Sequence, residues 1–183
     1  MRELSLNVMD IAQNSVKAGA SLISIIINES DKDDFLDIKI SDNGRGMTEE
    51  QVKQAIDPFF TTRTTRKVGL GIPLFKLAAE QTGGNLTIES TVGVGTATCA
   101  HFIKSSVDMT PLGDINSTVK ILIQCNPDID FLFTHSTDIG EFSLDTRQLR
   151  DVLSGVPLDT PDVLVWISEF LNENTANIYG GAD

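Results

Sequence analysis

The sequence predicts an α/β fold in which a helix, two strands, a long loop, a second helix and two further strands precede a different C-terminal segment. Two patterns carry this prediction. Apolar residues recur at helical spacing over residues 4–18, and apolar and polar residues alternate over residues 35–41. The 183 residues suffice for one good core, or for one domain with a smaller appendage.

The elements of the first half have recognisable ends. In chain order we predict a helix over residues 4–18, strands over 21–28 and 35–41, a helix over 70–81, and strands over 85–90 and 96–103. Gly19 favours the left-handed conformation that ends a helix. Thr48, with Gln51 three residues later, has the pattern of a capping box inside the long loop. A polar turn over residues 29–34 joins the first two strands.

The C-terminal segment predicts a second group of elements after a linker over residues 108–113. These are a helix over 114–125, strands over 130–136 and 141–144, and helices over 144–153 and 161–171. Asp145 and Thr160 are the expected N-caps of the last two helices. The segment contains no chemical motif, and it either packs on the first half or forms a separate interaction domain.

Charge is distributed unevenly along the chain, whose net charge is −12. Residues 1–107 carry a net charge of −2, and residues 108–183 carry a net charge of −10. We therefore predict two parts, a domain over residues 1–107 and an acidic appendage over residues 108–183. An acidic protein is poorly suited to non-specific nucleic-acid binding, because that binding requires cations that neutralise phosphates.

No stretch of the sequence has the ~18 apolar residues of a membrane span, and no secretion signal is visible. Cys99 and Cys125 lack the spacing of metal ligands, and two isolated thiols fit a reducing compartment. We therefore expect a cytoplasmic protein without membrane contact. The sequence leaves an oligomer possible.

The first chemical motif is a turn directly after the second predicted strand. Its residues are Asp42, Asn43, Gly44, Arg45 and Gly46. Alternate glycines let the backbone approach a flat ligand, and a carboxylate at the end of a strand can accept a hydrogen bond from an exocyclic amine. An ordinary turn explains the same residues equally well.

The second motif opens the helix predicted over residues 70–81. Its residues are Lys67, Val68, Gly69, Leu70 and Gly71, and Arg66 stands just upstream. Backbone N–H groups and the positive dipole end at a helix start bind phosphate, and glycine lets the anion lie close. The two neighbouring cations strengthen the prediction of a phosphate site.

The third motif is a polar stripe on the first predicted helix. Asp10 and Asn14 are four residues apart and so share a face, which Lys17 continues. A solvated helix face is the simplest explanation of such a stripe taken alone. The order and spacing of all three motifs favour a site instead.

Together the motifs resemble those of the GHKL ATPases, which include DNA gyrase, heat-shock chaperone ATPases, histidine kinases and mismatch-repair ATPases. The resemblance covers residues 1 to about 105. The matching boxes are Asp10-x-x-Gln13-Asn14-Ser15-x-x-Ala18, Asp42-x-Gly44-x-Gly46, Asp57-Pro58-Phe59-Phe60-Thr61-Thr62-Arg63, Gly69-Leu70-Gly71 and Gly93-x-Gly95-Thr96. The later boxes are most similar to histidine kinases, and the first helix is similar to mismatch-repair proteins. The resemblance implies a Bergerat-type fold, a two-layer sandwich of helices on a mixed β-sheet, with a small α/β C-terminal appendage.

The resemblance also implies which residues hold the adenine of ATP. Asp42 would bind the adenine amino group, and Gly44 belongs to the same glycine box. Gly46 would let the ring pack on the backbone, and Thr96 would support the ring from the neighbouring strand.

For the phosphates, the resemblance implies a metal ion and a mobile lid over residues 57–68. Asn14 would coordinate the Mg²⁺ that bridges the phosphates, and Lys17 would lie near them. The residues expected around the triphosphate are Arg66, Lys67, Gly69, Leu70 and Gly71. Asp10, the candidate catalytic base, stands where hydrolysing members carry a glutamate and is one methylene shorter, so the sequence predicts ATP binding and leaves fast hydrolysis open.

Two departures from the family shape the predicted function. No phosphoacceptor helix precedes the first helix, and we interpret His101 and His135 as structural or surface residues. The strand that usually precedes the first helix is also missing, and we predict that the strand containing Phe131 and Phe133 covers the open sheet edge. We therefore expect a kinase-like protein that transfers the γ-phosphoryl group of ATP to a His or Ser of a separate protein partner. A non-catalytic ATP sensor and a slow stand-alone ATPase are the alternatives.

Overall fold

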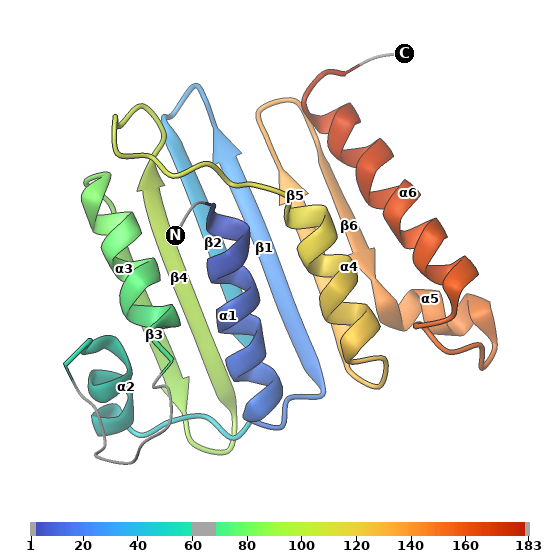
Figure 1. Cartoon of the computed structure of the whole chain (residues 1–183), viewed down its shortest axis with the longest axis horizontal. Helices are drawn as coiled ribbons and strands as arrows, with labels where there is room; N and C mark the ends of the chain where they lie inside the picture. The colour runs from blue at the N-terminus through green and yellow to red at the C-terminus, as the bar shows by residue number, and fades with distance from the viewer. Residues whose placement is uncertain (1–2, 60–68, 182–183) are drawn as a thin grey trace.

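The computed structural model describes residues 3–59 and 69–181 of the chain. Its helices are α1 (Leu4–Lys17), α2 (Glu49–Ile56), α3 (Gly71–Gln81), α4 (Ile115–Cys125), α5 (Thr146–Leu153) and α6 (Pro161–Ile178). Its strands are β1 (Leu22–Ser30), β2 (Phe35–Asp42), β3 (Asn85–Thr91), β4 (Gly95–Ile103), β5 (Asp130–Ser136) and β6 (Glu141–Asp145). These strands form one mixed sheet in the order β3-β4-β2-β1-β5-β6 (Figure 1).

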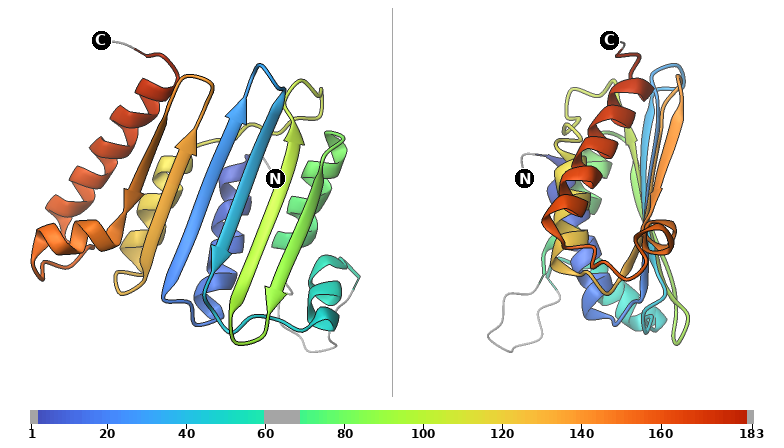
Figure 2. Two further views of the ribbon diagram at one scale, coloured as in Figure 1. Left: turned by 180° about the vertical axis from the view of Figure 1, so that it is seen from behind. Right: turned by 90° about the vertical axis from the view of Figure 1, so that its right-hand side faces the viewer.

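The architecture is a sandwich of one helical layer and one sheet layer. Helices α1, α3, α4 and α6 lie on the same face of the sheet, as the side view in Figure 2 shows. Neighbouring strands run antiparallel except β1 and β5, which are parallel. The predicted fold class, helices packed on a mixed sheet, is confirmed.

The core between the layers follows the two patterns that predicted the fold. Four apolar residues of α1 and the alternating isoleucines of β1 are buried. They are Leu4, Val8, Ile11, Ala12, Ile23, Ile25 and Ile27. Burying a side chain of isoleucine size stabilises a protein by about 1.5–3 kcal/mol, so α1 is firmly anchored on the sheet. Its polar stripe, with Asp10, Asn14 and Lys17, consequently faces solvent.

Most predicted ends of the elements agree with the structure. The capping box of Thr48 and Gln51 is present at α2, and the Asp145 side chain accepts a hydrogen bond from Arg147 N at the start of α5. Thr160 occupies the predicted N-cap position of α6, but its hydroxyl donates to Pro157 O, 2.7 Å away, and caps no N–H group of the helix. Helix α6 continues to Ile178, well beyond the predicted residue 171. None of the described helices is long and apolar enough to cross a bilayer.

Strand β5 pairs with the edge of β1 that would otherwise be open. Its register places Phe131 opposite Ile23 and Phe133 opposite Ile25, and both phenylalanines are about 1% exposed. The predicted covering of that edge is therefore confirmed. The sheet contains strands from both sides of residue 107, where the net charge of the chain changes. The division of the chain into two domains at that residue stays a prediction.

The connection between β4 and α4 also holds the first helix. The N–H groups of Leu4 and Ser5 donate to Pro111 O and Leu112 O, at 2.9 and 2.8 Å. The Glu3 carboxylate in turn accepts a hydrogen bond from Asp114 N, at 3.1 Å. The first N–H groups of a helix lack partners within the helix, so the later segment supplies the cap of α1.

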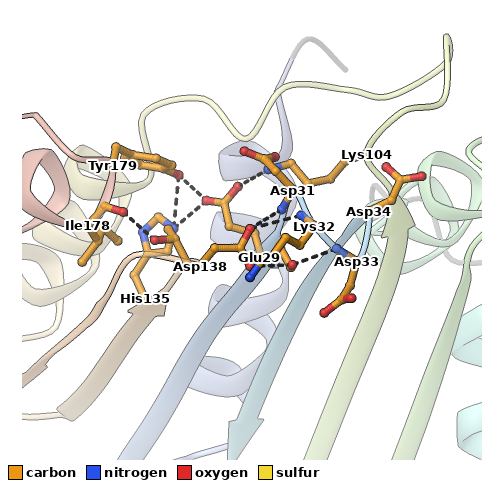
Figure 3. A network of polar contacts seen from close by, with 12 residues as sticks. Glu29, Asp31, Lys32, Asp33, Asp34, Lys104, His135, Asp138, Ile178 and Tyr179 are labelled. Atoms are coloured by element: carbon orange, nitrogen blue, oxygen red, sulfur yellow. Dashed lines mark hydrogen bonds and ion pairs between the residues drawn. The ribbon is translucent and has the colours of Figure 1, made fainter.

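A polar network joins β1, β5, the residue that follows β4 and the end of α6 (Figure 3). The buried imidazole of His135 lies 2.9 Å from Glu29 Oε1, and Lys104 Nζ lies 2.7 Å from Glu29 Oε2. The hydroxyl of Tyr179 donates to the same carboxylate. Burial raises the pKa of Glu29, but the three hydrogen bonds outweigh burial and bring it to about 2. The carboxylate thus stays ionised and ties the C-terminal helix to the first strand.

Candidate functional site

Two adjoining cavities lie where α1, the end of β2 and the start of α3 meet. The first has a volume of about 310 Å³ and is lined by Asn14, Lys17, Asp42, Gly46 and Thr96, among others. The second, of about 350 Å³, is lined by Asp10, Gln13, Asn14, Lys17, Gly69, Leu70 and Gly71. Asn14, Lys17 and Gly69 line both cavities, so the three motifs found in the sequence converge on one continuous site.

The carboxylate of Asp42 lines the first cavity and is held in a fixed orientation. Its Oδ2 accepts a hydrogen bond of 2.5 Å from the hydroxyl of Ser15, which is 3% exposed on α1. Its Oδ1 accepts a hydrogen bond of 2.9 Å from Gly44 N. A carboxylate offers about four acceptor positions, so Asp42 is fixed in orientation and can still accept from a ligand.

The turn after β2 is built so that it fits against α1. Asn43 Oδ1 accepts hydrogen bonds from Ser21 N and Leu22 N, at 2.9 and 3.0 Å. At Gly44 a Cβ atom would lie 2.8 Å from the Cβ of Ala18. Glycine is therefore needed at position 44 for the close approach of the turn to the helix, and Gly44 itself is not among the residues that line either cavity.

Gly46 lines the first cavity and adopts a φ of +70°. A Cβ atom at this position would lie 2.0 Å from the carbonyl oxygen of Thr91. The close contact with the turn between β3 and β4 is therefore one reason for glycine at this position. The ring packing that the family resemblance implies is another. The ring packing stays a prediction.

Thr96 contributes its side chain to the cavity from β4. Its hydroxyl lies 2.8 Å from the hydroxyl of Ser90 on β3, and Met47 N donates to Ser90 Oγ, also at 2.8 Å. Ser90 therefore joins the turn after β2 to the β3–β4 hairpin. Ser90 and the bond from Ser15 to Asp42 were not predicted from the sequence. A serine on the apolar face of the first helix was the available signal for Ser15.

The second cavity lies at the start of α3. Gly71 is the first residue of this helix, one residue later than predicted, and a Cβ atom there would lie 2.9 Å from the Cβ of Asp10. Helices α1 and α3 are thus in close contact, and this contact places the Asp10 carboxylate beside the N–H groups that open α3. Anions bind at such helix starts.

The chain offers few metal ligands at this site. The described residues contain no group of three or more His, Cys, Asp or Glu side chains that could hold a metal ion. Asn14, exposed on α1 and shared by both cavities, supplies one amide oxygen. Mg²⁺ keeps several waters and uses phosphate oxygens, so a single protein ligand fits this ion when phosphates are bound. The predicted phosphate contacts of Arg66 and Lys67, and most of the predicted lid, lie outside the described residues.

Comparison with known proteins agrees with this geometry. The model of the "Histidine kinase-, DNA gyrase B-, and HSP90-like ATPase" family matches residues 2–106. The chain belongs to this ATPase family. The resemblance to GHKL ATPases predicted from the sequence motifs is thereby confirmed, and the first half of the chain is an ATP-binding domain.

The chain is similar in sequence to a sensor protein and in fold to two solved structures. The sensor protein SrrB of Staphylococcus aureus is 35% identical over 101 residues, which are 52% of this chain and 17% of SrrB. The chain is also similar in structure to the Aquifex aeolicus MutL ATPase domain complexed with ADP, with a TM-score of 0.50 and 15% identity over 84% of this chain and 70% of that one. The N-terminal domain of a DNA repair protein gives a TM-score of 0.54 at 15% identity, over 79% of this chain and 52% of that one. The two solved structures show the shared fold alone.

Proposed function

We propose that the protein binds Mg-ATP along the two adjoining cavities and transfers the γ-phosphoryl group to a His or Ser of a separate protein partner. The observation that carries this proposal is the continuity of the site. Asp42 lies at one end, the start of α3 lies at the other, and Asn14 and Lys17 line both cavities between them.

The adenine occupies the first cavity in this proposal. Asp42 accepts a hydrogen bond from the exocyclic amine, because its carboxylate is already oriented by Ser15 and Gly44 N. The aliphatic side chains of Ile40 and Ile72 line the same cavity and can contact the ring faces. Thr96 contributes a hydroxyl group beside the ring.

The phosphates occupy the second cavity. The N–H groups at the start of α3 and the ammonium group of Lys17 offset the phosphate charge. Asn14 holds Mg²⁺ through its amide oxygen, and the ion supplies the charge neutralisation that phosphoryl transfer requires. Asp10 lies next to Gly71, where it can accept the proton of an attacking hydroxyl or imidazole group.

An apolar stripe beside the second cavity supports a protein acceptor. Leu70 at the N-cap of α3 is followed at helical spacing by Leu74 and Leu77 on this helix, and the three side chains are 49%, 38% and 49% exposed. Exposed leucines that form a continuous stripe are characteristic of protein-binding surfaces. A partner that docks on this stripe has its acceptor residue close to the γ-phosphate.

The alternative function is a non-catalytic ATP sensor. It is favoured by Asp10, whose side chain is shorter than the glutamate implied at this position and therefore reaches less far toward an acceptor. In that case nucleotide binding orders the site and changes partner binding without phosphoryl transfer.

A labelling experiment separates these functions. The protein is incubated with Mg²⁺ and ATP that is radiolabelled on the γ-phosphate, in the presence of candidate partner proteins. Labelled partner supports the kinase, and acid lability of the label distinguishes phosphohistidine from phosphoserine. Release of free phosphate alone indicates an ATPase, and tight binding without either product indicates the sensor. Absence of ATP binding contradicts the whole proposal.

A further inference from the structure

An apolar groove lies at the far edge of the sheet from the β3–β4 hairpin, where β6, α5 and α6 meet (Figure 1). Its volume is about 530 Å³. Its apolar lining includes Leu144, Leu149, Val152, Val163, Trp166 and Phe170. None of its lining residues lines either nucleotide cavity, so the groove is a separate feature of the molecule.

Two apolar residues of the groove are open to solvent, and the others form a buried or half-buried floor. Val152 on α5 is 80% exposed, and Trp166 on α6 is 45% exposed. The Trp166 ring stacks on Phe170 with the ring centroids 5.1 Å apart, so the indole is held in place. Leaving such residues exposed costs the free energy that burial would release, and contiguous apolar surface of this kind marks a binding site.

The rim of the groove is acidic. Residues 141–173 contain seven Asp or Glu and two Arg. Both arginines are already paired within the chain, Arg147 with Asp145 and Arg150 with Asp130, each at 2.8 Å. Asp162 lines the groove and is exposed, and Glu169 is exposed on the same helix. The surface around the apolar floor therefore carries a negative field that its own cations do not neutralise.

We propose that this groove binds a cationic amphipathic helix of a partner protein. Apolar residues spaced at three and four positions along such a helix would cover Val152 and Trp166, and Lys or Arg residues beside them would face Asp162 and Glu169. This proposal does not depend on the reaction at the nucleotide site.

Charge argues against the other occupants. A second copy of this chain brings the same acidic surface and a net charge of −12, which repels the rim. Nucleic acid and anionic lipid are repelled for the same reason. Addition of a strand to β6 is disfavoured because this strand has only five residues.

The protein contains one tryptophan, Trp166, which reports directly on the groove. The probe is a synthetic helix of about 15 residues with leucine at helical spacing and lysine at the other positions. Titration into the full-length protein, without nucleotide, is expected to give a saturable blue shift of the tryptophan emission that weakens as salt is added. The matched control is the same peptide with glutamate in place of lysine, which is expected to give no shift.

Two variants locate the binding. Val152→Asp places a charge on the exposed apolar surface of the groove and is expected to weaken binding of the lysine peptide by about tenfold or more. Asp162→Lys reverses one charge on the rim. It is expected to weaken binding of the lysine peptide and to reduce the salt dependence of that binding. Val107→Asp is the control, because Val107 is 99% exposed on the connection between β4 and α4 and does not line the groove. Thermal melting of each variant identifies any loss of fold.

Several outcomes overturn the proposal. They are the absence of a shift in folded protein, an equal shift with the glutamate peptide, and binding that Val152→Asp leaves unchanged. If the blue shift appears without peptide as the protein concentration rises, and sedimentation shows dimers, the groove binds a second copy of this chain. A shift caused by phosphatidylglycerol vesicles and by no peptide assigns it to a membrane surface. ATP binding is measured separately and has no bearing on these results.

Discussion

The hydroxyl of Ser15 donates a hydrogen bond of 2.5 Å to Oδ2 of Asp42 and so connects the first helix to the end of the second strand. Both groups come from elements that are anchored by buried isoleucines, Ile11 on α1 and Ile40 on β2. The carboxylate is thus oriented before any ligand arrives. Pre-orientation of this kind lowers the entropic cost of binding.

Replacement of the Asp42 carboxylate tests the adenine assignment. Asp42→Asn removes the charged acceptor, and hydrogen bonds to charged groups contribute about 1.5–3 kcal/mol, so ATP affinity should fall by about 10- to 100-fold. Isothermal titration calorimetry with an ATP analogue measures the change. Asp37→Asn is the matched control on the same strand, because Asp37 pairs with His101 instead of lining the site. Unchanged affinity in folded Asp42→Asn protein removes the adenine assignment.

Loss of the Asn14 amide tests the metal assignment. Asn14 is exposed, so Asn14→Ala should leave the melting temperature nearly unchanged while the gain in ATP affinity on adding Mg²⁺ shrinks by about tenfold or more. The measurement is ATP affinity with Mg²⁺ and with EDTA. Leu6→Ala is a suitable control on the same helix, because Leu6 is 46% exposed and lines neither cavity. An identical Mg²⁺ effect in wild type and Asn14→Ala contradicts the role of Asn14.

The turn at Gly46 tests the geometry of the site. Gly46→Ala would place a Cβ atom 2.0 Å from Thr91 O, and the alanine would have to adopt a positive φ, which L-residues rarely do. We expect displacement of the turn, weaker ATP binding and a loss of about 1–3 kcal/mol of unfolding free energy. Gly140→Ala is the control, because Gly140 lines neither cavity and a Cβ there would meet its nearest neighbour, Cγ2 of Ile178, at an ordinary 3.6 Å. Urea denaturation of the two variants gives the comparison, and equal stability would show that the turn is not constrained.

The network at Glu29 predicts a dependence of stability on pH. The folded-state pKa of Glu29 is about 2, below its ordinary value of 4.5, so its contribution to stability is complete above about pH 4.5 and is lost as the pH falls toward 2. Glu29→Gln should therefore destabilise the protein by about 3 kcal/mol at pH 7. The difference between wild type and variant should shrink progressively below pH 4.5.

Urea denaturation at several pH values measures this difference. Glu89→Gln is the control, since Glu89 is exposed on β3, and its effect should stay within about 0.5 kcal/mol. A Glu29→Gln variant as stable as wild type at pH 7 is the contrary result.

Removal of residues 108–183 tests whether the acidic half is part of the fold. Without them β1 loses its partner β5, and the N–H groups of Leu4 and Ser5 lose their acceptors. The remaining fragment should aggregate or melt at a lower temperature than the full chain, because it exposes a strand edge and apolar surface. Sedimentation and thermal melting are the measurements. An equally soluble and equally stable fragment is inconsistent with this view.

Much of the fold could be predicted because local patterns and tertiary burial agree. The alternation over residues 35–41 matches the observed burial on β2, and the helical spacing over 4–18 matches the buried face of α1. The extension of α6 to Ile178 was missed, because Asn172, Asn174 and Asn177 are weak helix formers. Tertiary contacts outweigh that propensity, since Leu171 and Ile178 are buried.

The candidate site was predicted less completely than the fold. Its charged and glycine residues follow recognisable spacing, and the structure brings Asp10, Asn14, Lys17 and Asp42 around adjoining cavities. The contacts that support them join residues distant in sequence, such as Met47 N with Ser90 Oγ. Such contacts depend on strand register, which the spacing of motifs within one sequence does not determine.

The parallel pairing of β1 with β5 determines when the protein can finish folding. Leu22 is paired with Asp130, so the ribosome must release most of the polypeptide before β1 acquires its second neighbour. Pairings this distant in sequence form slowly because a long loop must close first. Incomplete nascent chains therefore expose an apolar strand edge that chaperones can recognise.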